Sequence, residues 1–182
     1  MKLIIVRHTQ TDWNAVRRIQ GHVDRPLNAT GRKQARALAQ TLRNLGAHTI
    51  ISSDLQRAQQ TAAILNETLQ LPLTIDARLR ESSFGEIEGM TREQAVAHCG
   101  RWVAPYFHPE CYDYDFRSIG GEHGDTVFTR HKALLDEQHK KNPDAVLMLV
   151  AHARGLRTLL GRLGHPPKAP EQGTYMLINY PE

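Results

Sequence analysis

The sequence predicts an α/β fold, a three-layer sandwich in which helices cover both faces of a mostly parallel central sheet. Short apolar runs alternate along the chain with longer segments of helical periodicity, and this alternation is typical of that architecture. Two of the apolar runs end close to a histidine, as expected if parallel strands deliver both residues to one edge of the sheet. The length of 182 residues fits one domain, which we assign to residues 1–182.

The first half of the chain is predicted to hold two pairs of a strand and a helix. The apolar run Lys2–Val6 predicts a buried strand, and helical spacing over residues 31–45 predicts the first helix. Thr49–Ser52 predicts the second strand. Ser53 and Asp54 then offer side-chain oxygens that cap the next helix. The apolar stripe of that helix consists of Leu55, Ala58, Ala62, Leu65 and Leu69.

The alternation continues through the middle of the chain. Leu73–Ile75 predicts a short strand, and Thr91 with Gln94 has the spacing of a capping box, which predicts a short helix. Helical periodicity returns over residues 124–142, and Ala145–Val150 predicts a further strand.

The C-terminal segment is predicted to hold one more helix and a final strand. Leucines at helical spacing run from Leu156 to Leu163, and Gly164 ends that helix. A proline-rich loop follows over residues 165–173, and Thr174–Asn179 predicts the last strand.

The segment 97–124 interrupts the alternation and is rich in aromatic residues. It contains more than half of the chain's 4 Phe, 2 Trp and 5 Tyr, namely Trp102, Tyr106, Phe107, Tyr112, Tyr114 and Phe116. One interpretation is a lid-like insertion over the carboxyl edge of the sheet, where ligands bind in open α/β folds. The other is an aromatic cluster beneath a long loop. The sequence leaves both open.

The composition is that of an ordinary globular protein, with 40% hydrophobic and 23% charged residues. No apolar stretch approaches the roughly 20 residues of a membrane span, and the N-terminal apolar run is too short for a signal peptide core. Cys99 and Cys111 are too few for a disulfide scaffold. We therefore expect a cytoplasmic protein with free thiols and no membrane partner.

The formal net charge of +4 favours an anionic partner, either a phosphorylated metabolite or a nucleic acid. The basic runs Arg17-Arg18 and Lys140-Lys141 are short and typical of solvated surfaces, so no nucleic-acid partner is predicted. Side chains of the metal-ligand type are spaced too irregularly for a zinc site: His98, Cys99, His108 and Cys111. We expect no metal and no cofactor, and the oligomeric state stays open.

Two histidines at strand ends, His8 and His152, point to phosphate chemistry because arginines accompany them. Arg7 precedes the first, and Arg57 lies in the first turn of a predicted helix. A helix N-terminus and the planar donors of arginine together suit a dianionic phosphate. Nearby arginines also lower the pKa of an imidazole and keep it neutral and nucleophilic. Cleavage of a phosphoester further needs a proton for the leaving oxygen, so we expect a carboxyl group nearby.

The flanking residues form a series of short blocks along the chain: Arg7–Asn14, Arg18–Gly21, Asp24–Leu27, Ser52–Ala58 with Thr61-Ala62, Leu79–Glu81 with Gly85, Glu88-Gly89 and Thr91, and Leu149–His152. Together these blocks closely resemble the signature of the histidine phosphatase superfamily, the phosphoglycerate-mutase-like proteins. The resemblance covers nearly the whole chain in the family's order. Each block alone is weak evidence, but the ensemble is highly specific.

On the matching positions, the resemblance implies that His8 is the nucleophile that forms a phosphohistidine and that Glu81 is the acid and base. It also implies a phosphate pocket made of Arg7, Asn14, Gln20, Arg57 and His152. Glu88 matches a position that is usually structural, so we leave it outside the site.

These roles predict a metal-independent phosphomonoesterase that acts on a small phosphorylated metabolite. One alternative is phosphotransfer of the phosphoglycerate mutase type, although family mutases that depend on bisphosphoglycerate are generally longer. Another is a non-catalytic module that binds a phosphorylated ligand, which would be expected to lack His8 or Glu81. The leaving group stays open, because the family processes sugar phosphates, phosphoglycerates, nucleotide-like esters, α-ribazole phosphate and phosphohistidine proteins.

Three positions depart from the family pattern. Thr9 stands where glycine usually follows the first histidine, and we expect its Cβ to strain or narrow the phosphate pocket. Ala153 stands where glycine is common after the second histidine, and we expect little consequence because alanine is small. His123 replaces the serine of a Gly-Glu-Ser segment, which leaves the contacts of that segment open.

Overall fold

A five-stranded sheet forms the centre of the protein, seen in a computed structural model that describes residues 1–181. The strands are β1 (Lys2–Arg7), β2 (Thr49–Ser52), β3 (Leu73–Ile75), β4 (Val146–Ala151) and β5 (Tyr175–Asn179). They lie in the order β3-β2-β4-β1-β5. All neighbouring pairs are parallel except that of β1 with β5, which confirms the mostly parallel sheet.

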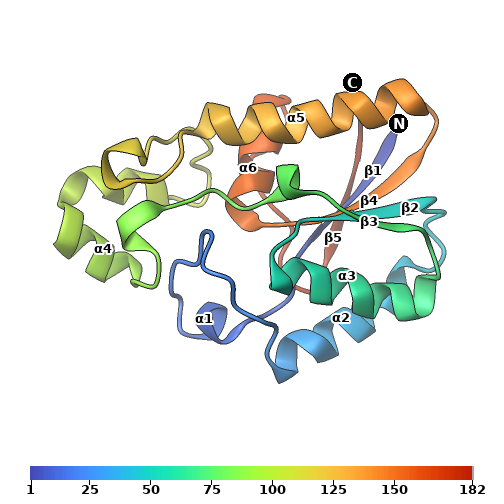
Figure 1. The fold of residues 1–182 in the computed structure, drawn as a ribbon, viewed down its shortest axis with the longest axis horizontal. Helices are drawn as coiled ribbons and strands as arrows, with labels where there is room; N and C mark the ends of the chain where they lie inside the picture. The colour runs from blue at the N-terminus through green and yellow to red at the C-terminus, as the bar shows by residue number, and fades with distance from the viewer. Residues whose placement is uncertain (182) are drawn as a thin grey trace.

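Helices cover both faces of this sheet, as Figure 1 shows. The long helices are α2 (Ala29–Leu42), α3 (Gln56–Leu69), α5 (Gly124–Lys141) and α6 (Ala153–Arg162). Along β1, Ile4 and Val6 pack with α2 and α3, whereas Leu3 and Ile5 pack with α5 and α6. Because successive strand residues point to opposite faces, one buried strand supplies both cores and the three-layer sandwich is confirmed.

Two shorter helices lie outside these layers. Helix α4 (Arg92–Cys99) begins at the predicted capping box, where Gln94 N donates to Thr91 Oγ1 at 3.3 Å. Helix α1 (Asp12–Ala15) was not predicted, because four residues are too few to show helical periodicity. Short 3-10 helices are η1 (Ala77–Leu79), η2 (Gly85–Ile87), η3 (Arg101–Phe107) and η4 (Arg117–Ile119).

The start of α3 differs from the predicted cap. Leu55 is the N-cap residue, and no side chain of its own caps the helix. Asp54 instead pairs with Arg80 at 2.7 Å, and the N–H of Gln56 is bound by Asp24 at 2.8 Å. The prediction was wrong for Asp54 because this residue has a stronger charged partner far along the chain. Ser53 Oγ accepts from the N–H of Leu55 at 3.3 Å, one residue before the helix.

The aromatic segment lies beside the sheet and builds a core of its own with α4 and η2 (Figure 1). Tyr114 and Phe116 are buried, and the Phe116 ring meets Phe84 edge to face at 5.3 Å. Its Phe107 lines the cavity described below, so the segment forms an aromatic cluster and also reaches the site. Glu182, the last residue of the predicted domain, lies outside the described residues. No helix within residues 1–181 is both long and apolar enough to cross a membrane.

Candidate active site

The pairing of β1 with β4 brings the two predicted histidines together. The register places Arg7 opposite Ala151, and His8 N donates to the carbonyl of Ala151 at 2.9 Å. Because the strands are parallel and neighbouring, the next residue of each emerges at the same sheet edge. The His8 and His152 rings accordingly lie with their centroids 5.1 Å apart.

A cavity of about 460 Å³ opens at this edge. Six of the seven predicted site residues line it: Arg7, His8, Asn14, Gln20, Arg57 and Glu81. His152 does not line the cavity and is fully buried behind it. Its predicted contact with phosphate therefore stays a prediction.

His8 is held as a neutral imidazole whose second ring nitrogen makes no hydrogen bond within residues 1–181. Its Nδ1 lies 2.8 Å from the carbonyl oxygen of Thr9. A carbonyl can only accept a hydrogen bond, so Nδ1 carries the proton and Nε2 keeps its lone pair. Burial lowers the pKa of His8 well below 6.5, and the charges of Arg57 and Arg7 lower it further. The free Nε2 is thus in the state that a nucleophile requires at neutral pH.

His152 supports Arg57 from behind the cavity. Arg57 Nε donates to His152 Nδ1 at 3.2 Å, which leaves the imidazole proton on Nε2, 2.8 Å from Ser53 Oγ. Burial is the main reason that the pKa of His152 is lowered well below 6.5. A neutral His152 is the form that accepts this hydrogen bond.

Arg7 and Arg57 differ in how many of their N–H donors are hydrogen-bonded within the protein. Arg57 is 1% exposed and donates to the carbonyls of Gly21 and Val23 at 2.7 and 3.0 Å. Arg7 Nε is buried without any hydrogen-bond partner among residues 1–181, and burial lowers the pKa of its guanidinium. Arg7 lines the cavity, so an anion there would pair with the charge of its guanidinium.

Asn14 and Gln20 present amide groups to the same cavity. Asn14 Oδ1 accepts from Thr11 N at 3.1 Å and from Gln172 at 2.8 Å, and the hydroxyl of Thr11 donates its one hydrogen to Gln20 Oε1 at 3.1 Å. With their oxygens bound in this way, the NH₂ groups of the two amides are available to an anion.

Glu81 reaches the cavity through the N-terminus of α6. Gly155 N and Ser82 N donate to its Oε1 at 2.8 and 2.9 Å, and Arg154 N donates to Oε2 at 3.0 Å. The first-turn amides of a helix are otherwise unpaired donors, so they locate this carboxyl group at the cavity wall.

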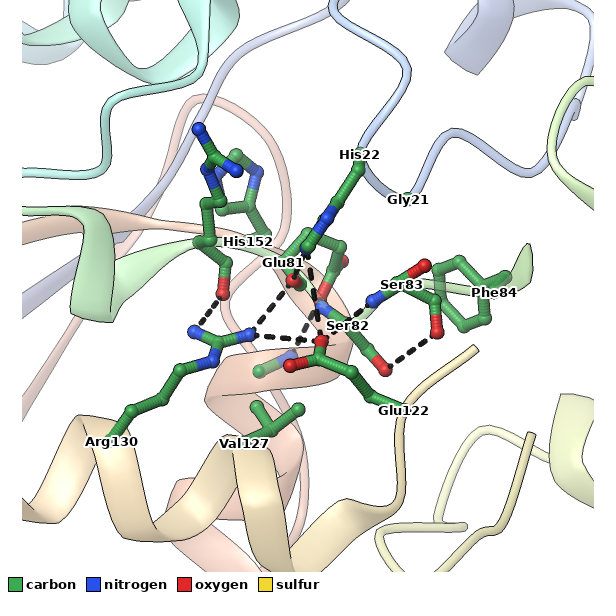
Figure 2. A network of polar contacts seen from close by, with 12 residues as sticks. Gly21, His22, Glu81, Ser82, Ser83, Phe84, Glu122, Val127, Arg130 and His152 are labelled. Atoms are coloured by element: carbon green, nitrogen blue, oxygen red, sulfur yellow. Dashed lines mark hydrogen bonds and ion pairs between the residues drawn. The ribbon is translucent and has the colours of Figure 1, made fainter. Parts of the chain in front are cut away.

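The backbone around Glu81 is held by a network that we call the acid-loop clamp, made of Arg130, Glu122 and His22 (Figure 2). Arg130 Nη2 donates to the carbonyl of Glu81 at 2.8 Å, and His22 Nε2 donates to the same oxygen at 2.9 Å. Glu122 accepts from Ser83 N at 2.8 Å and from Arg130 at 3.3 Å. The clamp therefore fixes the backbone around Glu81, which we call the acid loop, through Arg130 and Glu122 from one segment and His22 from another.

The chain matches the sequence profile of the histidine phosphatase superfamily (branch 1) over residues 3–175. It belongs to that family. A probable phosphoglycerate mutase GpmB of Yersinia enterocolitica is 36% identical over 170 residues, which cover 93% of this chain and 78% of the relative.

Solved structures of the histidine phosphatase superfamily share the fold. A mycobacterial glucosyl-3-phosphoglycerate phosphatase in complex with VO3 is 31% identical and superposes with a TM-score of 0.85, covering 97% of this chain and 90% of that one. The α-ribazole phosphatase of Shigella flexneri is 25% identical, with a TM-score of 0.82 and coverages of 98% and 90%.

The three departures from the superfamily pattern affect only the immediate surroundings of each residue. Thr9 is fully buried and does not line the cavity, and its Oγ1 lies 3.3 Å from Thr61 Oγ1. Its φ is not positive, so its backbone is not in the strained left-handed region. The expectation that Thr9 strains or narrows the pocket was wrong. His123 caps α5, where its Nδ1 accepts from Asp125 N at 3.0 Å. Ala153 lines the cavity at the start of α6, where its small side chain adds little bulk.

Several cavity residues were not predicted. They are Arg17, Arg18, Ile19, Gly21, Phe84, Arg92, Glu93, Phe107, Ala153, Arg154 and Arg157. Arg154 and Arg157 lie three residues apart just after His152. This helical spacing places them on one face, and it could have marked both as candidate cavity residues. The acid-loop clamp carries no such signal, since its members come from separate segments. Residues 1–181 contain no group of three or more metal-ligating side chains placed to hold a metal ion.

Proposed function

We propose that this protein is a metal-independent phosphomonoesterase that acts on a small phosphorylated metabolite through a phosphohistidine intermediate. The observation that carries the proposal is the state of His8, a neutral imidazole whose Nε2 is free in a cavity walled by Arg7 and Arg57. The two guanidinium groups supply positive charge at the site without a divalent ion.

The reaction proceeds in two steps on this geometry. His8 Nε2 attacks phosphorus, the bond from phosphorus to the leaving oxygen breaks, and Glu81 gives that oxygen a proton. Water then attacks the phosphohistidine, Glu81 takes a proton from the water, and the phosphorus–nitrogen bond breaks to restore neutral His8. Arg7 and Arg57, together with the amides of Asn14 and Gln20, stabilise the negative charge on the other phosphate oxygens.

The test combines product release with trapping of the intermediate. A panel of phosphorylated metabolites should yield inorganic phosphate in buffer with EDTA, and ³²P from a labelled substrate should enter the protein in an acid-labile form. The variant His8→Ala should do neither, although it keeps part of its phosphate affinity through Arg7 and Arg57. Wild-type turnover by His8→Ala, or complete loss of activity in EDTA that one metal restores, would refute the proposal.

The GpmB relative favours a second candidate, phosphoglycerate mutase activity, in which the same groups return the phosphoryl group to another hydroxyl. The named phosphatases among the structural neighbours favour hydrolysis. Incubation with 3-phosphoglycerate and a trace of 2,3-bisphosphoglycerate separates the two. Formation of 2-phosphoglycerate in excess of inorganic phosphate identifies a mutase, and release of phosphate alone identifies a phosphatase.

A further inference from the structure

A three-residue loop, Gly21–Val23, lies between the buried Arg57 and the carboxylate of Glu88. On one side, the carbonyls of its first and last residues accept hydrogen bonds from Arg57 at 2.7 and 3.0 Å. On the other side, the N–H groups of His22 and Val23 donate to the two oxygens of Glu88, both at 3.0 Å. The loop therefore joins a cation of the phosphate pocket to a carboxylate that does not line the cavity.

One peptide group of this loop makes contact on both sides. The peptide bond between Gly21 and His22 presents its carbonyl oxygen to Arg57 and its N–H to Glu88 Oε1. Hydrogen bonds in such a chain polarise and strengthen one another. Burial lowers the pKa of Arg57, and the negative charge of Glu88 is among those that oppose this shift. The two charged groups are thus coupled through the backbone between them.

The same carboxylate also binds the segment that follows the proposed acid. Glu88 Oε1 accepts from Phe84 N at 2.9 Å and lies 3.4 Å from Ser83 Oγ. Figure 2 shows these two residues near His22, whose ring reaches the carbonyl of Glu81 at 2.9 Å. One carboxylate therefore fastens the loop that holds Arg57 to the acid loop.

Gly21 leaves the space that this arrangement needs. Its φ is +53°, a left-handed conformation that favours glycine, and a Cβ at this position would lie 2.0 Å from Glu88 Oε1. The carboxylate thus packs directly against the backbone of the loop. The place of the two carbonyls that bind Arg57 consequently depends on where Glu88 lies.

We propose that Glu88 is a positioning residue that acts on phosphate binding through Arg57. The peptide group between Gly21 and His22 transmits the effect, and the guanidinium is oriented when the protein folds and not when an anion arrives. This inference rests on the proposed function, because it assumes that a phosphate occupies the cavity beside Arg57. It assigns a role in binding to a residue that the sequence alone left outside the site.

The sign of the effect separates positioning from a simple charge effect. A carboxylate near an anion site repels the anion, so if Glu88 acted through its charge alone, its neutralisation would tighten phosphate binding. Positioning predicts weaker binding, because the loop loses one of its two fixed acceptors. Glutamine makes this change with nearly the same shape, since its NH₂ group cannot accept a hydrogen bond.

The experiment measures the Kd of inorganic phosphate by calorimetry, which needs no turnover. Glu88→Gln should raise this Kd about 10-fold, the size of one lost hydrogen bond to a charged group. The matched control is Glu86→Gln, which removes the same charge two residues earlier from an exposed side chain that pairs with His98 at 3.6 Å. Glu86 does not line the cavity, so the Kd of this variant should equal that of the wild type.

A double-mutant cycle tests whether Glu88 acts through Arg57. Lysine cannot bind both carbonyls of the loop, so in the Arg57→Lys protein the further change Glu88→Gln should alter the Kd by about 2-fold or less. The same loss with and without Arg57→Lys would show a general structural effect and overturn the proposal. If Glu88→Gln fails to fold, Glu88→Asp replaces it, because aspartate keeps the charge but is too short to bind both N–H groups in the same place, and its Kd should also rise.

The outcomes distinguish this inference from the proposed function. An unchanged or lower Kd in Glu88→Gln, with phosphate release by the wild type intact, overturns the inference about Glu88 alone. A wild type that binds phosphate and shows the expected cycle supports the inference even if no tested ester is cleaved. Absence of any phosphate binding by the wild type overturns both.

Discussion

Arg57 donates a hydrogen bond from Nε to Nδ1 of His152 across 3.2 Å, and this bond ties the phosphate pocket to the second histidine. The remaining nitrogens of Arg57 bind the carbonyls of Gly21 and Val23. Each of those terminal nitrogens has a second hydrogen that is free for a ligand. His152 in turn lies against Ser53. The pair therefore orients a buried guanidinium for anion binding.

Replacing Arg57 with lysine should be almost as harmful as removing it. Lysine keeps the charge but cannot bind His152, Gly21 and Val23 at once, because it lacks the planar fork. We expect kcat/KM for a phosphomonoester to fall at least about 10-fold in Arg57→Lys, the size of one lost charge-assisted hydrogen bond. The matched control is Arg32→Lys, whose arginine binds a single carbonyl, that of Leu27. Wild-type kcat/KM in Arg57→Lys would contradict this role.

Glu81→Gln should separate substrates by the quality of their leaving group. Glutamine keeps the shape and the two hydrogen bonds that Oε1 accepts, but its NH₂ group cannot accept from Arg154 N and it cannot give a proton to the leaving oxygen. Alkyl phosphates should lose about 10²-fold more activity than p-nitrophenyl phosphate, whose aryl oxide departs without a proton. The measurement is kcat on both ester types in wild type and variant. Equal losses would assign Glu81 a positioning role and make Glu93, the other carboxylate on the cavity wall, the next candidate.

The acid-loop clamp predicts that Arg130 acts on catalysis through Glu81. Arg130→Gln should loosen the loop, because its guanidinium binds the carbonyls of Arg78, Arg80 and Glu81. We expect kcat to fall while KM changes little, and the loss should be larger for alkyl than for aryl esters. A merely structural role would lower both ester types alike. Lys132→Gln, on the exposed side of the same helix, serves as the control.

Thr9→Gly should alter stability more than turnover. Thr9 N donates to Thr61 Oγ1 at 3.1 Å, and its own hydroxyl lies against the same oxygen, on the side away from the cavity. We expect the free energy of unfolding to fall by about 1 kcal/mol, from the lost side-chain contact and the added backbone freedom. Turnover should stay within about 2-fold, and Thr9→Ser should resemble the wild type. A gain in turnover of 10-fold or more in Thr9→Gly would show that Thr9 does restrict the pocket.

Three buried histidines make stability depend on pH. Burial lowers the pKa of His8 and His152 well below 6.5 and that of His131 to about 3. Below about pH 6.5 the unfolded chain takes up protons that the folded protein does not, so stability falls as pH falls. Each histidine contributes up to about 1.4 kcal/mol per pH unit.

Urea unfolding at pH 7, 6 and 5 measures this dependence. In the variant His131→Gln, the free energy of unfolding should fall less steeply with falling pH, by the contribution of one proton, whatever the variant's stability at pH 7. An identical slope in wild type and variant would show that His131 binds its proton equally well in the folded and unfolded states.

Most of the sandwich could be predicted from the sequence because its signals are local. An apolar run that ends at Arg7 and His8 marks the carboxyl end of a strand, and the run before His152 marks another. Neighbouring parallel strands meet at one edge, so their common site follows from the two patterns. The role of Glu81 could be predicted only through the resemblance to the family, because a loop carboxylate by itself shows no periodicity.

The directions of the side chains were decided by the tertiary structure alone. Thr9 turns away from the pocket because Thr61 lies on α3, 52 positions along the chain. The acid-loop clamp joins Arg130 to Glu81, 49 positions apart, and the pairing of Asp54 with Arg80 displaces the predicted helix cap. Periodicity assigns a residue to a strand or a helix face, but which nitrogen of His8 is free, or which N–H groups Glu88 binds, depends on contacts that only folding brings together.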